Sequence, residues 1–202
     1  MLRIAVRLPP LTADVGEYLA DVTALEAAGA DTIWMDDAAG EPWIVLGAIA
    51  ALTHRPRLGC MLTSRTRWPA SRLGASAATL GQVSRGRLVV ALQAGGRLTN
   101  HISTLHQTGA KVFTAGAHDP SADGVIFEVE AADQLQEASR TQKEVWAAIA
   151  IPSDREAWTR AISVYAAAGA TGILVPWDPR LIDLLRGAGE PDDRTDLLIA
   201  TG

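Results

Sequence analysis

Polar side chains that can transfer protons or bind ligands follow several short apolar runs of the chain. Carboxylates and imidazoles exchange protons in enzyme sites, and hydroxyl and amide groups form hydrogen bonds to ligands. The candidates, in chain order, are Asp36 and Asp37, Thr63 and Ser64, Gln93, and His118. Because the carboxyl ends of parallel strands meet at one edge of a sheet, we expect these residues to gather around one site.

The segments that must position these residues alternate between apolar strands and amphipathic helices. Strands apolar on both faces are typical of a parallel sheet covered by helices. An eight-stranded pattern predicts an α/β fold of the TIM (β/α)8 type, although the chain is at the short end of that fold's range of about 200 to 400 residues. After a first strand that ends near Arg7, strands are predicted at 32–35, 57–63, 88–92, 111–115, 124–129, 145–151 and 172–176, and helices at 42–53, from 70 through 83, and at 98–106, 131–139, 153–168 and 179–186.

The connection between the fifth and sixth predicted strands is unusually short. Only residues 116–123 separate them, whereas a parallel crossover with its helix takes at least about 10 to 12 residues. The two strands therefore form either a crossover that has lost its helix or a local hairpin.

Composition limits the class of protein without defining its activity. The length suits one domain, so we expect residues 1–202 to form a single unit, with 187–202 as a C-terminal tail. A net charge of −5 without a basic run argues against nucleic acid or a membrane as the main partner. No apolar run reaches the roughly 20 residues of a membrane span. A lone Cys60 suits a reducing compartment, and we expect a cytoplasmic protein.

Motifs in the first half of the chain resemble those of the luciferase-like flavin- and deazaflavin-dependent oxidoreductases. The resemblance is close over the first half and loose over the second. It rests on Ala27-Ala28-Gly29, Asp31, Trp34, Asp36, Pro42-Trp43, Leu46, Ala48, Ala51, Thr53, Arg57-Leu58-Gly59, Pro69-Ala70, Ala78-Thr79-Leu80, Ser84 and Gly86-Arg87-Leu88. The family also starts its sixth strand with a motif like Ala122-Asp123-Gly124, which favours the shortened crossover over a hairpin.

The resemblance implies a cofactor, FMN or a deazaflavin of the F420 type, and assigns roles to the strand-end residues. Asp36, Asp37 and His118 are the expected catalytic residues, and Thr63, Ser64 and Gln93 the expected cofactor contacts. Many relatives have histidine where this chain has Asp37, and glycine where it has Gln93. Alternatively, Asp36 or Asp37 caps the following helix, the threonine and serine bond to their own loop, and the glutamine fills space needed by a cofactor.

The remaining histidines and the tryptophans have simpler interpretations. His101 and His106 are five residues apart on a predicted helix, so they do not share a face, and we expect two surface histidines and no metal site. His118 is either a proton-transfer residue or an exposed loop residue. Trp34 and Trp43 match apolar positions of the family and are expected to pack, whereas Trp68 and Trp177, near strand ends, could stack on an aromatic ligand.

Three functions remain open at the level of sequence. The first is a luciferase-like oxidoreductase or monooxygenase that acts on a small organic substrate. The second is a shortened, non-catalytic relative that holds a ligand or stabilises a partner, and the third is a cofactor-free reaction by Asp37 and His118. Small residues on the helix at 42–53 and the resemblance to the family imply a homodimer or a heterodimer with a longer homologue.

Overall fold

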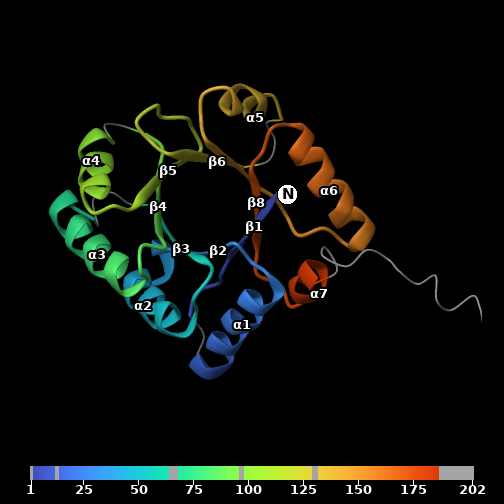
Figure 1. Ribbon diagram of the computed structural model, residues 1–202, viewed down its shortest axis with the longest axis horizontal. Coiled ribbons are helices and arrows are strands. Elements are labelled where there is room, and N and C mark those ends of the chain that lie inside the picture. The colour runs from blue at the N-terminus through green and yellow to red at the C-terminus, as the bar shows by residue number, and fades with distance from the viewer. Residues whose placement is uncertain (1, 12–13, 64–67, 96–97, 129–131, 187–202) are drawn as a thin grey trace, which may run out of the picture.

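Eight short apolar segments form parallel strands that close into a barrel (Figure 1). The computed structural model describes residues 2–11, 14–63, 68–95, 98–128 and 132–186. The strands pair in chain order, and the last pairs with the first. They are β1 (Arg3–Arg7), β2 (Thr32–Asp36), β3 (Arg57–Leu62), β4 (Leu88–Gln93), β5 (Lys111–Ala115), β6 (Gly124–Glu128), β7 (Glu144–Ala148) and β8 (Gly172–Pro176). The prediction of a TIM-type barrel is confirmed.

Helices alternate with the strands and surround the barrel (Figure 1). Aspartate caps two of them. The side chain of Asp14 accepts a hydrogen bond from the Glu17 amide at the start of α1, and Asp154 does the same with the Ala157 amide at the start of α6. The helices are α1 (Val15–Ala28), α2 (Pro42–Leu52), α3 (Ala70–Val83), α4 (Thr99–Gln107), α5 (Ala132–Ser139), α6 (Arg155–Ala167) and α7 (Leu181–Arg186), with a short 3-10 helix, η1 (Asp37–Ala39).

Large rings fill the inside of the barrel because glycines on neighbouring strands leave room for them. Trp34 and Trp146 are both buried inside, together with Phe113. A Cβ atom on Gly59 would lie 2.2 Å from the ring of Trp34, and one on Gly172 would lie 2.4 Å from the ring of Trp146. These two glycines are therefore required by packing, and the interior is a solid core rather than a channel.

The connection between β5 and β6 is a crossover without a helix. Phe113, Thr114 and Ala115 pair in parallel with Gly124, Val125 and Ile126, which excludes a hairpin because a hairpin would make the strands antiparallel. Residues 116–123 return to the start of β6 as turns and extended chain. The preference for a shortened crossover is confirmed.

The strand predicted at 145–151 is three residues shorter at its C-terminal end. β7 ends at Ala148, although the Ile149 amide still donates to the carbonyl of Leu174. Ile149 and Ile151 are apolar because they pack against the core from a loop that also lines a cavity. Hydrophobicity alone did not distinguish this partly buried loop from a strand.

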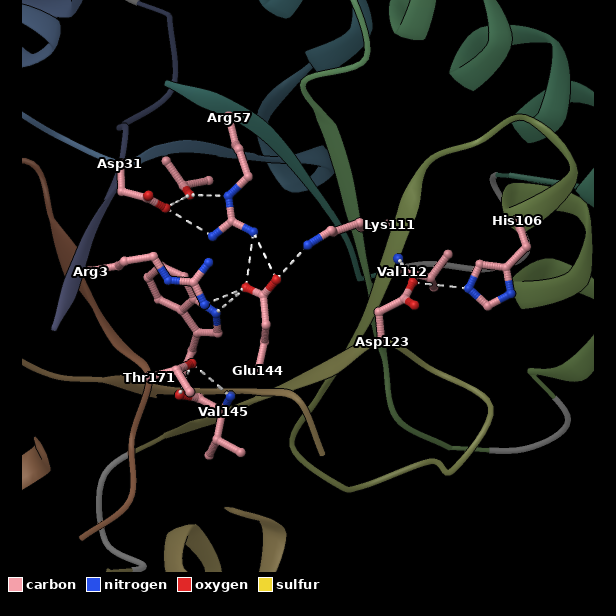
Figure 2. Close-up of polar contacts among 12 residues, drawn as sticks. Arg3, Asp31, Arg57, His106, Lys111, Val112, Asp123, Glu144, Val145 and Thr171 are labelled. Atoms are coloured by element: carbon pink, nitrogen blue, oxygen red, sulfur yellow. Dashed lines mark hydrogen bonds and ion pairs between the residues drawn. The ribbon is translucent and has the colours of Figure 1, made fainter. Parts of the chain in front are cut away.

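A charged cluster closes the N-terminal end of the barrel (Figure 2). Its central carboxylate, Glu144, contacts Arg3 at 2.7 Å, Arg57 at 2.9 Å and Lys111 at 2.7 Å. These four residues are the first residues of β7, β1, β3 and β5. They form one layer because alternate strands of a TIM barrel contribute side chains at the same height.

The cluster fixes the ionisation of its carboxylate. Burial alone would raise the pKa of Glu144, but the hydrogen bond from Lys111 and the charges of Arg57 and Arg3 outweigh it and lower the pKa from 4.5 to about 2. Arg57 also contacts Asp31 at 2.9 Å, and both arginines lie over the ring of Trp146. The end of the barrel opposite the predicted site is thus held by a compensated ionic network.

Two further predictions concern the C-terminal tail and membrane-spanning helices. Residues 187–202, predicted as a tail, lie outside the described residues. Among the described helices, none has the length and apolar character needed to span a bilayer.

Candidate active site at the barrel mouth

Four polar side chains point into the barrel mouth at the C-terminal ends of the strands. Side chains alternate along a strand, and Ala5, Trp34, Ala91 and Ile126 all lie in the interior cluster. The residues two positions further on are Arg7, Asp36, Gln93 and Glu128, the last residues of β1, β2, β4 and β6. The position is that of active sites in TIM-barrel enzymes.

Arg7 and Asp36 form an ion pair across the first two strands. Nε of Arg7 donates to Oδ2 of Asp36 at 2.8 Å, and Nη2 donates to the same oxygen. The other carboxylate oxygen, Oδ1, is buried and accepts no hydrogen bond from the described residues. The pair therefore holds the guanidinium in a fixed orientation while one acceptor remains unused.

Asp37 is buried, and its carboxylate binds the chain that follows β3. Oδ1 accepts hydrogen bonds from the Thr63 amide at 2.8 Å and from the Thr63 hydroxyl at 2.6 Å. Oδ2 accepts a hydrogen bond from the indole Nε1 of Trp68 at 2.9 Å. The amide and hydroxyl of Thr63, expected to face a cofactor, are thus directed to this carboxylate, and Ser64 lies outside the described residues.

Neither carboxylate occupies the capping role that was the alternative. Asp36 precedes η1 but makes no side-chain capping hydrogen bond there, and the residue before α2 is Glu41. Asp37 is already within η1. The two neighbouring aspartates thus have different structural roles. Asp36 faces the mouth, whereas Asp37 joins β2 to the loop after β3.

One of the aromatic expectations changes with the structure. Trp68 is buried, with 1% of its surface exposed, and packs edge-on against Trp43, so the expectation that it stacks on a ligand is wrong. Trp34 and Trp43 pack as expected. Trp177 is half-buried against the outer core, and its amide donates to the carbonyl of Arg7.

Two cavities open beside the ion pair. The larger has a volume of about 890 Å³ and is lined by Arg7, Glu128, Ala148, Tyr165 and Leu174 among others. Burial raises the pKa of the Tyr165 phenol. The smaller has a volume of about 350 Å³ and includes Asp36. Both volumes lie in the range of about 300 to 1,000 Å³ that is usual for small-molecule sites.

Comparison with known proteins identifies the family. Residues 3–111 match the model of the luciferase-like monooxygenase family, which is more than half of the chain. The chain belongs to this family. The match includes β1 to β4 and therefore Arg7, Asp36, Asp37, Thr63 and Gln93.

Solved structures confirm the fold of this luciferase-like protein. The coenzyme F420-dependent tetrahydromethanopterin reductase from Methanopyrus kandleri has a TM-score of 0.69 at 11% identity, with 94% of this chain and 97% of that chain covered. An F420-dependent secondary alcohol dehydrogenase, solved with an F420-acetone adduct, has a TM-score of 0.71 at 14% identity, with 93% and 98% covered.

A third structure, the tryptophan synthase alpha-subunit from Pyrococcus furiosus, has a TM-score of 0.66 at 12% identity, with 94% of this chain and 93% of that chain covered. Enzymes described by different activities thus share the barrel, so these likenesses establish the fold and no activity. A comparison with curated proteins gave no match.

Gln93 is at the mouth of this luciferase-like barrel and is exposed. It lies beside Gly116, the first residue after β5, where a Cβ atom would come within 3.3 Å of the glutamine Nε2. Gly116 has a φ of 91°, a conformation that favours glycine. The glutamine therefore occupies space at the mouth and presents an amide there, which leaves both interpretations of this residue open.

His118 is placed away from the other candidates. It lies in the return connection after β5, and its Nε2 is 3.5 Å from the hydroxyl of Thr141, in the turn before β7. The next residue, Asp119, accepts a hydrogen bond from the side chain of Gln142 at its carbonyl. Because the connection lacks a helix, it leaves the mouth at once and carries this histidine toward the opposite end of the barrel.

The other histidines do not form a metal site. His101 Nε2 lies 3.2 Å from the carbonyl of Trp68, and His106 Nε2 lies 3.0 Å from Asp123 Oδ2. His106 is exposed as expected, but His101 is half-buried, so the expectation of two surface histidines holds for one of them. Within the described ranges, no group of three or more potential ligands is close enough to hold a metal ion.

No role was predicted from the sequence for Arg7, Glu128 or Tyr165, three residues that line the larger cavity. The inward alternation could have singled out the first two, because each is two residues beyond an interior position. Tyr165 comes from α6, and nothing in the local sequence indicates that this helix borders the mouth.

Proposed function

We propose that the protein is an oxidoreductase that binds FMN or a deazaflavin of the F420 type in the larger cavity and acts on a small organic substrate. The observation that carries the proposal is a cavity of about 890 Å³ at the C-terminal ends of the strands of a luciferase-like barrel, with Arg7 in its wall. The two F420-dependent structural neighbours support a deazaflavin, since they share the fold and are described by that coenzyme.

The residues of the cavity suit a ring system with polar oxygens. Nε and Nη2 of Arg7 bind Asp36, and within the described residues Nη1 makes no hydrogen bond, so it can donate to a ring carbonyl. Leu174, Ile149 and Pro176 supply apolar surface that excludes water. The bound cofactor would supply hydride transfer or oxygen activation, and the protein orientation and shielding.

Three groups of this chain can hold or move protons beside such a ring. Tyr165 is protonated near neutral pH and can donate a hydrogen bond, since the ordinary pKa of a phenol is about 10 and burial raises the pKa of Tyr165 further. Glu128 is an exposed carboxylate on the opposite side of the cavity from β1 and β2, and Asp36 fixes the guanidinium of Arg7. Asp37 acts on position only, by joining β2 to the loop after β3.

A cofactor titration tests the proposal. We expect the protein to change the fluorescence of FMN or F420 with saturation in the micromolar range, and Arg7→Ala to weaken this binding about tenfold, as for the loss of a charged hydrogen bond. Arg140→Ala, at an exposed arginine in the turn after α5, should leave this binding unchanged. Absence of binding of both cofactors at high micromolar concentration would contradict the proposal.

A second candidate function is that of a non-catalytic subunit. It is favoured by the absence of a helix in residues 116–123 and by the use of Thr63 for a structural contact with Asp37. The two functions differ in turnover. If the protein binds a reduced cofactor without altering its rate of reoxidation and copurifies with a longer homologue, the subunit function is correct.

The outer surface of α2 and α3 supports association with another chain. Ile44 and Val83 are exposed by 74% and 49%, and they line a groove of about 360 Å³ together with Trp43, Gly47 and Leu80. Burial of such apolar surface favours association. We propose a homodimer through this groove, with a heterodimer with a longer homologue as the alternative.

A further inference from the structure

Basic side chains surround the N-terminal end of the barrel, opposite the mouth. Arg55 lies in the turn before β3, Arg85 in the turn before β4, Lys111 begins β5, and Lys143 directly precedes β7. All four residues are exposed, and the first three lie at the starts of consecutive strands of the closed sheet. We call this arc of cations the basic rim. It borders the central cluster around Glu144 (Figure 2).

The carboxylates at this end are engaged inside the fold and leave positive charge on the basic rim. Those that begin or directly precede a strand are Asp31, Asp123 and Glu144. Asp31 contacts Arg57 at 2.9 Å, and Asp123 accepts a hydrogen bond from the Val112 amide at 2.9 Å (Figure 2). Glu144 is shared by Arg3, Arg57 and Lys111, so it compensates Lys111 only in part.

The other members of the rim have weak partners or none. Within the described residues, neither Arg85 nor Lys143 forms an ion pair. Arg55 is 72% exposed and reaches the Glu26 carboxylate only at 3.9 Å, because that oxygen accepts the amides of His54 and Arg55. Since the whole chain has a net charge of −5, the rim is a basic patch on an acidic protein. Such a patch steers an oppositely charged partner toward one end of the molecule.

The backbone of Arg85 is a second, independent observation at the rim. Its φ is 57°, and it is the one non-glycine residue with a positive φ among those described. This left-handed conformation favours glycine, which the next residue, Gly86, supplies at a φ of 78°. Because the Arg85 side chain is exposed, what it adds at this position is a positive charge in solvent. Unfavourable backbone conformations of this kind are concentrated at functional sites.

We propose that the basic rim binds an acidic segment of a partner protein. Lysine and arginine bind carboxylates through charged hydrogen bonds, so glutamate and aspartate side chains suit the rim. Nucleic acid is disfavoured, because domains that bind it usually have a pI above about 9, whereas this chain has a pI of 5.3. A partner bound at this end leaves the mouth open, so the interaction does not depend on the proposed cofactor or reaction.

The test is a chemical-shift titration of the isotope-labelled full chain with a short poly-glutamate peptide at low ionic strength. We expect saturable shifts at the amides around Arg55, Arg85 and Lys143, and none around Gln93 at the mouth. A poly-glutamine peptide of the same length should not bind. The shifts should disappear in 1 M salt, where the screening length falls to about 3 Å.

Two rim variants separate binding from folding. Arg85→Gly should weaken peptide binding about three- to fivefold, as for one exposed ion contact. It should also keep or raise stability in urea, since glycine suits a φ of 57° better. Lys143→Ala should weaken binding to a similar extent. Arg160→Ala removes the same charge from the exposed surface of α6 and is the matched control, which should bind like the original protein.

Three outcomes would overturn the proposal. The first is the absence of saturable shifts up to about 1 mM peptide at low ionic strength. The second is unchanged binding when Arg85→Gly and Lys143→Ala are combined, or an equal loss in Arg160→Ala. The third is tighter binding of a duplex DNA of equal charge than of the peptide, which would assign the rim to nucleic acid.

Discussion

The indole Nε1 of Trp68 lies 2.9 Å from Oδ2 of Asp37 and donates a hydrogen bond to it. The two residues are 31 positions apart, and their contact joins the end of β2 to the chain before α3. Since the carboxylate also accepts two hydrogen bonds from Thr63, it fixes the position of the loop after β3 at the mouth.

Replacing Asp37 by alanine should therefore destabilise the fold. The substitution leaves the amide and hydroxyl of Thr63 and the indole of Trp68 without their acceptor, and we expect the free energy of unfolding to fall by about 2 to 3 kcal/mol. Urea denaturation measures the loss. Glu137→Ala, at an exposed position on α5, should change stability by less than about 0.5 kcal/mol. A variant as stable as the control would show that these contacts contribute nothing.

The ionic cluster at the opposite end should make stability depend on pH. The pKa of Glu144 is lowered from 4.5 to about 2 in the folded protein, so its contribution is complete above pH 4.5 and is lost as the pH falls toward 2. The shift corresponds to about 3 kcal/mol. Glu144→Gln should remove this part of the pH dependence.

Denaturant unfolding between neutral and acidic pH compares the two proteins. The variant should be less stable near neutral pH because Arg3, Arg57 and Lys111 lose their shared carboxylate, and the difference should shrink in acid. If the two profiles run parallel down to the lowest pH, the carboxylate is not linked to folding in this way.

The contact between Gly59 and Trp34 predicts a specific rescue. A methyl group at position 59 would lie 2.2 Å from the indole, so Gly59→Ala should cost about 3 kcal/mol or prevent folding. Adding Trp34→Leu should recover part of this stability, which thermal or urea unfolding can measure. Gly81→Ala, on α3 with no atom within 4 Å of the added carbon, should stabilise slightly and is the control. Equal effects of the two glycine substitutions would refute the packing argument.

The proposed homodimer can be tested at its apolar groove. Ile44→Asp should shift the protein from dimer to monomer in sedimentation at micromolar concentration, because a charge would be buried in the interface. Val164→Asp changes another exposed aliphatic residue, on α6 and 56% exposed, and should leave the assembly unchanged. A monomeric original protein at this concentration would remove the dimer.

The elements of the barrel were predictable because each strand is a short apolar run between turn residues. The pairing of β5 with β6 followed from chain length and the resemblance, since a run such as 116–123 cannot contain a crossover helix. The end of β7 was missed because Ile149 and Ile151 pack against the core, partly buried, without being in a strand. A run of apolar residues indicates that side chains pack against the core, but a loop can pack there as well as a strand.

The site was less predictable because its contacts join distant parts of the chain. Asp36 was expected at the mouth, but its pairing with Arg7 across 29 positions depends on the register of β1 and β2. Trp68 was expected to stack on a ligand because its hydrogen-bond partner Asp37 is remote in sequence and could not be foreseen. His118 was expected at the mouth because it follows a strand end closely in sequence. The chain turns away after that end, and the side chain lies near Thr141 instead.

The eight-residue return between β5 and β6 leaves that part of the barrel without the outer helix that its neighbours have (Figure 1). Along this sector the wall is a single layer of strands backed by turns. Cooperative protection of backbone amides depends on packing from both sides, so exchange with solvent deuterium is expected to be fastest here among the strands. This part of the barrel wall borders Gln93 at the mouth. Local opening of β5 and β6 would therefore change the surroundings of any molecule bound there.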